Sequence, residues 1–416
     1  MTYRILSLDG GGPWALIQAC ALADIFPNQS GHQILKQFNC AIANSGGSIT
    51  LAGLIKDLKP TDIAGLFCSP ADRSRLFVPL WYSWFTTELG LGPKWNTEKK
   101  FVGLREIMNA PGTPAVADVA FSNLSGIVGD TQIVITAYDY DLNREIFFCS
   151  RRSPLANADA FVPTLAGAVH ASADPPVNYF DKPANVTSKT GNPITRRFWD
   201  GGVGGYNNPV LHGVVEGLAQ RVGHEDIIAL SIGSAMTWRP LGPPAGDADP
   251  TLFAKEDSPG IGDIKKMAEA ILDDPPDAAT LNAHVVISGA DTKTRIIRLN
   301  PVIGPESING AGWHLPDGFS KFTWKGRPID ALTAFNKLFA MPMDAVDQPS
   351  VDMIKALAGI WIADGVGNQP VQRDLETGDA IIGHNRYSLA RDAWLALMGT
   401  APRHPTTPSF AKWPTR

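Results

Sequence analysis

The sequence predicts an α/β fold with three layers, in which a largely parallel central sheet carries helices on both faces. The apolar runs at 3–8 and 38–43 have the length of short buried strands. Each leads through a glycine-containing turn into a helix-like run, at 14–25 and 48–58. Strands that alternate with helices in this way usually form parallel sheets, because each crossover helix returns the chain to the same edge.

The later elements are less regular. Residues 66–130 do not continue the alternation and are expected to be inserted, and a Gly/Pro/Asp-rich loop is expected at 240–263. The tail at 402–416 is rich in Pro and Thr and is expected to pack poorly. The other expected elements are strands at 132–138, 145–149, 198–199, 226–232 and 294–299, and helices at 165–171, 209–220, 263–272, 327–340, 350–363 and 385–398.

Composition excludes several classes of protein. The chain has 416 residues, of which 44% are hydrophobic, enough for a sizeable core. A net charge of −5 argues against a nucleic-acid-binding protein, and four widely spaced cysteines predict no disulfide framework. The start of the chain runs directly into a strand without a signal-peptide pattern, and no apolar stretch is long enough to cross a bilayer. We therefore expect a cytoplasmic protein, with peripheral membrane contact as an open alternative.

Ser45 lies in a context typical of a nucleophilic serine. It follows the strand expected at 38–43 and precedes Gly46 and Gly47, which open a helix. This nucleophile elbow lifts a serine hydroxyl above the sheet edge. The first glycine of the G-x-S-x-G pattern is replaced by Ala43, and the alanine adds one methyl group to the turn. A loop serine that caps the helix would explain the same residues without chemistry.

A run of three glycines, Gly10, Gly11 and Gly12, follows the first strand. Backbone N–H groups in such a turn, together with the start of a helix, can bind a phosphate or the oxyanion of an acyl-transfer intermediate. The Walker A and dinucleotide patterns are incomplete, so no nucleotide cofactor is predicted. A simple tight turn is the alternative interpretation.

Asp200 follows another strand and precedes Gly201 and Gly202. A carboxylate held there would face the same sheet edge as Ser45 and could accept a proton from it. An aspartate that only stabilises an Asx-turn is the alternative.

Together, these three segments resemble the patatin-like phospholipase family, which combines a DGGG-type loop, a GxSxG serine and a DGG or DGA aspartate in this order. The segments 164–176, 207–210 and 230–233 resemble further blocks of that family. The resemblance spans roughly residues 3–300. One departure is at 13–15, where Pro-Trp-Ala replaces the family's usual x-Arg/Lys-Gly.

The resemblance implies a patatin-like fold and a serine hydrolase that cleaves lipid acyl esters, as a phospholipase A or lysophospholipase does. Ser45 and Asp200 would form a catalytic dyad that needs no cofactor or metal. The N–H groups of Gly10, Gly11 and Gly12 would bind the oxyanion, chiefly those of Gly11 and Gly12. An acyltransferase or thioesterase with the same dyad is one alternative, and a catalytically weak lipid-binding or scaffold protein is another.

The resemblance and the expected elements divide the chain into a hydrolase domain at 1–305, with an inserted cap at 66–130, a helical extension at 306–401 packed on it, and the tail. The oligomeric state is not predicted. The inserted segment is rich in aromatic residues, which we expect either to contact substrate or lipid or to pack in a local core. These aromatic residues are Trp81, Tyr82, Trp84 and Phe85.

Eight histidines are scattered along the chain without an HxxxH or HExxH pair, so no metal site is predicted. His170 and His212 lie close to the family blocks, and either one would complete a Ser-His-Asp triad as an alternative to the dyad.

Overall fold

The protein is described here by a computed structural model. The structure describes residues 2–83, 92–151, 161–189, 193–240, 252–253, 276–289, 291, 293–307, 312–374 and 377–399. The expectations for Trp84, Phe85, the helix at 263–272 and the tail at 402–416 lie outside these residues, as does most of the loop at 240–263.

A mixed sheet of eight strands forms the centre of the fold. Five neighbouring strands are parallel, as the sequence predicts: β3 (Gln132–Asp139), β2 (Cys40–Ala43), β1 (Tyr3–Leu8), β7 (Ile227–Ile232) and β9 (Ile296–Leu299). Three further strands join through antiparallel pairs: β4 (Arg144–Cys149) and β6 (Thr195–Asp200) each pair with β3, and β5 (Ala184–Thr187) pairs with β6. The short β5 was not predicted, because its edge position alternates buried and exposed residues and leaves no apolar run.

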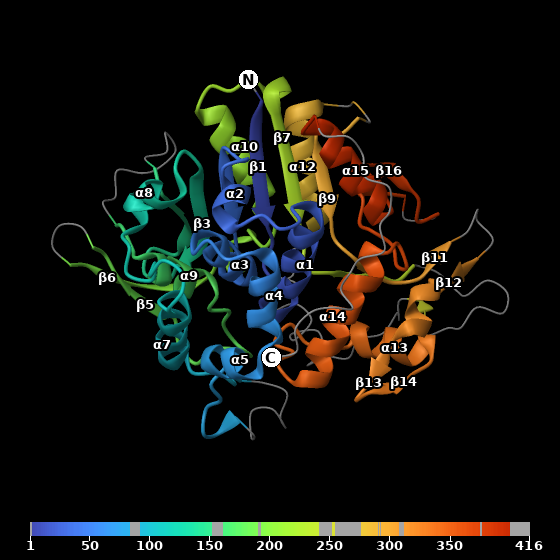
Figure 1. Cartoon of the computed structure of the whole chain (residues 1–416), viewed down its shortest axis with the longest axis horizontal. Coiled ribbons are helices and arrows are strands. Elements are labelled where there is room, and N and C mark those ends of the chain that lie inside the picture. The colour runs from blue at the N-terminus through green and yellow to red at the C-terminus, as the bar shows by residue number, and fades with distance from the viewer. Residues whose placement is uncertain are drawn as a thin grey trace.

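Helices cover both faces of the sheet and produce the three expected layers (Figure 1). Successive strand residues point to opposite faces, so Ile5 and Ile42 belong to one apolar cluster while Leu6 and Ala41 belong to the other. The first cluster is covered by α10 (Val210–Ala219) and α12 (Pro276–Ser288). The second is covered by α1 (Leu16–Ile25), α3 (Ser45–Ile55), α9 (Leu165–Ser172) and α15 (Tyr387–Leu397).

The segment between β2 and β3 is mostly helical. Proline in the first turn and serine or asparagine caps start these helices: Ser69 accepts the N–H of Asp72, and Asn96 accepts that of Lys99. After α3, the helices of this segment are α4 (Pro60–Cys68), α5 (Pro70–Leu76), α7 (Thr97–Met108) and α8 (Ser125–Val128), with a 3-10 turn, η2 (Phe121–Asn123). A further short helix, α2 (Gly31–Leu35), precedes β2.

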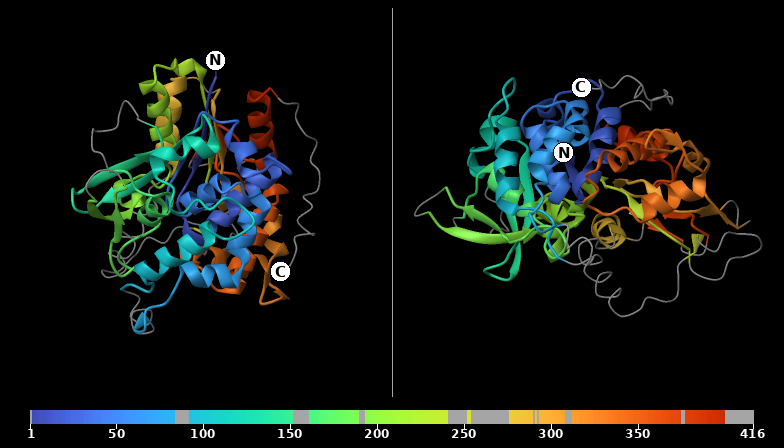
Figure 2. Two further views of the ribbon diagram at one scale, coloured as in Figure 1. Left: turned by 60° about the vertical axis from the view of Figure 1, so that its left-hand side comes forward. Right: turned by 90° about the horizontal axis from the view of Figure 1, so that it is seen from below.

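The region after β9 lies beside the sheet, on the side away from α5 and α7 (Figures 1 and 2). Its helices α13 (Ala331–Phe339) and α14 (Gln348–Ile362) agree with the prediction, except that the first starts later, where Asp330 caps it. The remaining short elements are the strands β8 (Met236–Thr237), β10 (Val302–Ile303), β11 (Glu306–Ser307), β12 (Trp313–His314), β13 (Thr323–Trp324), β14 (Arg327–Pro328), β15 (Gln372–Arg373) and β16 (Ala380–Ile382), and the 3-10 turns η1 (Gly12–Ala15), η3 (Gly201–Gly204), η4 (His224–Asp226) and η6 (Asp317–Lys321).

Two strands of the sheet run toward each other along one edge of β3. Strand β4 occupies the opposite edge from Val134 to Asp139, so β2 and β6 share the remaining one. The pairing of β2 ends with Ala43 beside Ile135, and that of β6 ends with Asp200 beside Ala137. The carboxyl ends of β2 and β6 therefore meet beside Thr136. This junction positions the candidate site.

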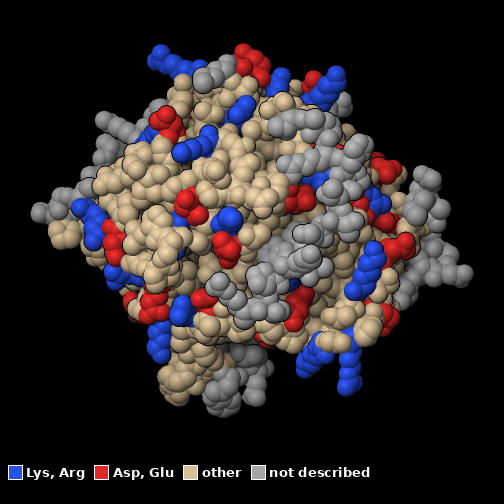
Figure 3. Space-filling view, in the orientation of Figure 1, with Lys and Arg blue, Asp and Glu red and all other residues tan. Residues whose placement is uncertain are grey.

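The surface offers little further indication of a partner. On the face shown in Figure 3, acidic and basic side chains of the described residues are interspersed. None of the helices that the structure describes is both long enough and apolar enough to cross a membrane.

Candidate active site

Ser45 forms a strained turn between β2 and α3. Its φ angle is 48°, in the left-handed region that non-glycine residues seldom adopt. A Cβ atom at Gly46 would overlap the backbone of Gly12, and one at Gly47 would overlap the carbonyl groups of Leu8 and Asp9. Glycine at both positions therefore lets the start of α3 approach the glycine loop closely. This geometry is that of a nucleophile elbow.

Asp200 lies at the end of β6 and is buried. Its Oδ1 accepts hydrogen bonds from Asn44 Nδ2 at 3.0 Å and from the N–H of Gly202 at 2.8 Å. Burial raises the pKa of this carboxyl, and hydrogen bonding from the Ser45 side chain, Gly202 and Asn44 and the charge of Lys100 oppose the rise. A raised pKa makes Asp200 a better proton acceptor than an ordinary aspartate when it is ionised.

Asn44 connects the two candidate residues, and its role was not predicted. Its amide donates to Asp200, while its Oδ1 accepts from Thr136 Oγ1 at 2.7 Å and from Ser172 Oγ at 3.4 Å. Ser172 Oγ in turn accepts the N–H of Ser45 at 2.8 Å. Both residues occur in segments that carry the family resemblance, but only the meeting of β2 and β6 reveals what they contact.

The three glycines of the glycine loop, Gly10 to Gly12, differ in what their N–H groups can do. The N–H of Gly10 donates to the carbonyl of Asn207 at 2.8 Å, so it is already used in holding the loop. Gly11 and Gly12 have φ angles of 142° and 53°, which favour glycine. Within the described part of the chain, no hydrogen-bond acceptor is found for their N–H groups. The loop therefore offers Gly11 and Gly12, rather than Gly10, as donors to a ligand.

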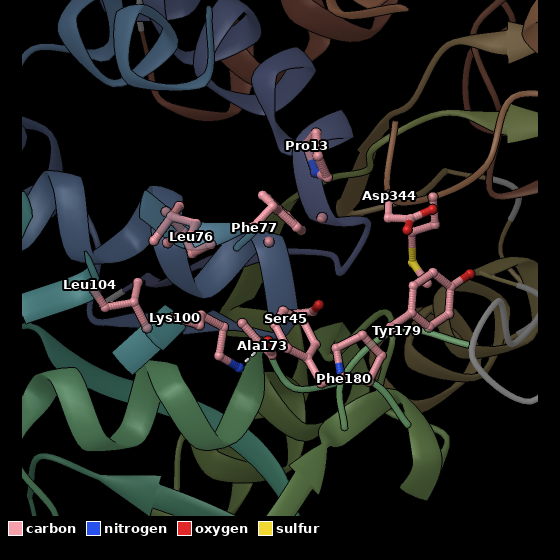
Figure 4. A pocket seen from close by; sticks show the side chains of 15 residues that line it. Pro13, Ser45, Leu76, Phe77, Lys100, Leu104, Ala173, Tyr179, Phe180 and Asp344 are labelled. Carbon is pink, nitrogen blue, oxygen red and sulfur yellow. Dashed lines mark hydrogen bonds between the residues drawn. The ribbon is translucent and has the colours of Figure 1, made fainter. Parts of the chain in front are cut away.

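An apolar pocket of about 480 Å³, including its open mouth, begins at Ser45 and Gly12 (Figure 4). A second hollow of about 630 Å³ adjoins it, with walls that include Ile49, Leu76 and Leu104 in both. The second hollow continues along α3 past Ala52 to Met108. Together they form a largely apolar channel between α3, α5 and α7.

Trp81 and Tyr82 are not among the residues that line this channel. Trp81 is 87% exposed and stacks edge-on against Tyr82 with ring centroids 5.3 Å apart. Instead, the pocket wall includes Phe77, which the sequence did not single out, and Phe180.

Neither histidine considered for a triad lies in a position to act on Ser45. His170 is buried on α9, where it stacks on Phe101 with centroids 4.7 Å apart, and burial lowers its pKa well below the ordinary value. His212 stacks on Phe147 at 3.5 Å. In the described residues, neither imidazole hydrogen-bonds to Ser45 or Asp200. No cluster of three or more potential metal ligands occurs among those residues either.

The fold and the pocket place the chain in a class of α/β proteins with a strained serine and a buried carboxylate at the edge of a mostly parallel sheet. The model of the patatin-like phospholipase family matches residues 6–213, which is half of the chain. The chain therefore belongs to the patatin-like phospholipase family.

A comparison with solved structures finds the crystal structure of VipD from Legionella pneumophila. The similarity has a TM-score of 0.32 and 11% sequence identity, and it covers 86% of this chain and 66% of VipD. The chain thus spans just under two thirds of that protein. No curated protein sequence is significantly similar to this chain.

Proposed function

We propose that the protein is a serine hydrolase that cleaves acyl esters of lipids, of the phospholipase A or lysophospholipase type, with Ser45 and Asp200 as a catalytic dyad. The observation that carries this proposal is the junction of β2 and β6, where Ser45 and the buried Asp200 lie together beside Thr136 at the mouth of an apolar channel.

The proposed reaction has two halves. Ser45 Oγ attacks the ester carbonyl while the Asp200 carboxylate accepts its proton, and the departing alcohol takes that proton away. A water molecule then attacks the acyl-enzyme while Asp200 accepts one of its protons. The bond between Ser45 Oγ and the acyl carbon breaks, the fatty acid leaves, and Asp200 returns the proton to Ser45 Oγ. The N–H groups of Gly11 and Gly12 stabilise the oxyanion in both halves. Their place directly after β1 and their lack of another acceptor among the described residues support this role.

The acyl chain occupies the channel in this proposal. Burying one methylene group contributes about 0.8 kcal/mol, so a channel with almost wholly apolar walls favours long acyl chains. Outside it, the exposed Trp81 with Tyr82 contacts the lipid surface from which the substrate is taken. Contact with lipid there would be peripheral.

We also propose that residues 1–305 form the hydrolase domain, with 66–130 as its cap and 306–401 as an extension packed on it. Leu76 and Leu104, from α5 and α7 of the cap, form part of the channel wall and support this division. The extension contributes Met343 and Asp344 to the pocket.

Covalent labelling of Ser45 tests the proposed function. A fluorophosphonate probe should label the wild-type protein but not Ser45→Ala, and the same substitution should abolish hydrolysis of a nitrophenyl ester. Ser48→Ala is the matched control, because Ser48 Oγ donates to the Ser45 carbonyl at 2.6 Å and lies one turn along the same helix. Equal labelling of Ser45→Ala and wild type would refute the dyad. Labelling without hydrolysis of any ester or thioester, but with transfer to added alcohols, would indicate an acyltransferase.

A protein that folds normally but is not labelled at all would instead be a binding or scaffold protein. A panel of phospholipids, lysophospholipids and acyl thioesters would then be used to identify its ligand by binding. For a labelled protein, the same panel identifies the preferred head group and linkage.

A further inference from the structure

A buried cation in the wall of the Ser45 pocket has no part in the mechanism above. Lys100, on α7, lines the pocket near Ser45 and is 3% exposed (Figure 4). Its Nζ donates to the carbonyl of His170 at 3.2 Å, to the carbonyl of Ala173 at 2.6 Å and to the carboxylate of Asp174. An ammonium group has three donors, so all of them are used within the protein. Lys100 is therefore not available to bind an anionic substrate group.

The acceptors of Lys100 lie at the end of α9, and this segment holds both members of the dyad by their backbones. Ser172 Oγ accepts the N–H of Ser45 at 2.8 Å. The carbonyl of Asp174, two residues further on, accepts the N–H of Asp200 at 3.2 Å. One short stretch of chain thus sets the position of Ser45 relative to Asp200, and Lys100 fixes that stretch from a separate helix.

The charge of Lys100 also acts on the dyad. It opposes the effect of burial on the pKa of Asp200. Burial raises the pKa of Asp174 to about 7, again against the influence of Lys100, and burial lowers the pKa of Lys100 itself. The charged or titratable groups that face one another here are Lys100 of α7, His170 of α9, Asp174, Asp181 and Lys182 of the following segment, and Asp200 of β6.

We propose that Lys100 is a positioning residue for the Ser45–Asp200 pair: it anchors the end of α9, which holds both backbones, and it supplies the positive charge that faces the Asp200 carboxylate. The inference rests on the proposed function, because it assigns a role to Lys100 in that same reaction. The aromatic ring of Phe180, 4.2 Å from Nζ, shields this charge from the open pocket.

The inference is tested with variants that separate charge from packing. Lys100→Met keeps an apolar stem in the pocket wall but leaves Asp174 as an unpaired buried carboxyl, which can prevent folding. The double variant Lys100→Met with Asp174→Asn removes both charges and avoids that cost. Lys100→Arg keeps the positive charge. The matched control is Arg391→Met, because Arg391 on α15 is also buried and also pairs with a carboxylate, that of Asp24, but lines neither hollow.

The first measurement is the rate of fluorophosphonate labelling of Ser45 as a function of pH. The second is the pH dependence of kcat and KM for hydrolysis of a short-chain ester. Without the lysine charge the pKa of Asp200 rises, so the base form is lost at a higher pH. Asp174→Asn alone is the reference for the double variant, because the negative charge of Asp174 itself acts on Asp200. Relative to that reference, we expect the acidic limb of the pH profile to move up by about 0.5–1 pH unit in the double variant, since a nearby opposite charge typically lowers a carboxyl pKa by about 1–3 units. We expect kcat to fall several-fold, and we expect KM to change much less. Lys100→Arg should keep the limb in place, and Arg391→Met should lower only thermal stability.

The outcomes distinguish this inference from the proposed function. An acidic limb that lies at the same pH in the double variant and in Asp174→Asn alone overturns the inference, whatever happens to the rate, because a purely structural lysine would lower labelling equally at every pH. A shift in Lys100→Arg as large as that in Lys100→Met overturns it as well. If wild-type Ser45 is never labelled, the proposed function itself has failed.

Discussion

The parts of the chain before and after β7 contribute to the site in different ways. The family-matched segment, residues 6–213, carries Ser45, Asp200 and the glycine loop. The region after β7 carries none of these groups, yet it contacts the chain on both sides of the glycine loop. One contact is to Asp9, directly before the loop, and the other is to Trp14, shortly after it. The comparison indicates that the candidate chemistry is local to one part of the chain, whereas the position of the oxyanion donors depends on both.

The contact before the glycine loop is a buried ion pair. The guanidinium group of Arg298, on β9, lies 2.6 Å from the carboxylate of Asp9, the residue before the glycine loop. It also donates to Ser231 Oγ at 2.9 Å. Burial raises the pKa of Asp9 to about 6, against the effect of Arg298. This pair holds the base of the loop and does not line the pocket.

The contact after the glycine loop is made by the segment between α13 and α14. Trp14 Nε1 donates to the carbonyl of Pro342 at 3.2 Å. Asp344, in the pocket wall, accepts from Trp95 Nε1 at 2.8 Å and pairs with Lys94 at 3.1 Å. The segment therefore connects the glycine loop to the cap, which is far away in sequence.

The largest expected effect tests the family-matched part. Asp200→Asn keeps the shape and the Asx-turn of the aspartate but cannot accept the Ser45 proton, so kcat should fall by about 10²–10⁴-fold at neutral pH. In the wild type, the raised pKa of Asp200 places the acidic limb of kcat/KM above the usual range of an aspartate, with activity lost as the pH falls through it. A variant within about threefold of wild type, with normal circular dichroism, would contradict the dyad.

The second prediction tests the supporting part. Arg298→Met leaves Asp9 buried without its cation, and breaking such a pair typically costs about 3–5 kcal/mol in the free energy of unfolding. In the folded variant the pKa of Asp9 rises further, above its wild-type value of about 6, while the unfolded chains ionise alike, so the loss relative to wild type should grow as the pH rises above about 6. Urea unfolding at acidic and at neutral pH measures this.

Adding Asp9→Asn to Arg298→Met should recover much of the lost stability, because no charge is then buried alone. If Arg298→Met instead keeps full stability but loses all labelling of Ser45, the division between chemistry and support is wrong.

The third prediction asks whether the family-matched part also sets substrate choice. Ala52→Phe places a ring in the second hollow, beyond Ile49, and should reduce hydrolysis of palmitate esters by about tenfold or more relative to butyrate esters. Val102→Phe, on the exposed side of α7, is the control and should leave this ratio unchanged. An unchanged ratio in Ala52→Phe would place the acyl chain elsewhere.

The smallest expected effect concerns the exposed pair Trp81 and Tyr82. Trp81→Ala should lower hydrolysis of vesicle lipids by about fivefold, because a tryptophan at a lipid surface contributes roughly 1 kcal/mol, while soluble short-chain esters should be unaffected. Tyr140→Ala, at another exposed aromatic residue, is the matched control. Equal effects on vesicles and soluble esters would indicate that Trp81 supports the cap instead.

Much of the fold could be predicted because its elements carry local signals. The parallel strands are buried apolar runs, and their helices follow turns that the glycines mark. The short β5 and the 13-residue α12 were missed, the first because it is a polar edge strand and the second because its apolar residues do not stand out from its surroundings. The assignment of Gly10 as a possible donor could not be refined, since its acceptor, Asn207, is almost two hundred residues away.

The sequence by itself determined the three-layer class and pointed to Ser45, Asp200 and the glycine loop, because a tight turn after a buried strand demands small residues at fixed spacing. Only the tertiary structure decided which side chains surround them. The roles of Lys100, Ser172 and Arg298 depend on contacts between segments that are distant in the chain, and no local pattern encodes such contacts. The energy of a buried charge depends on everything packed around it, so these residues become interpretable only once the fold is known.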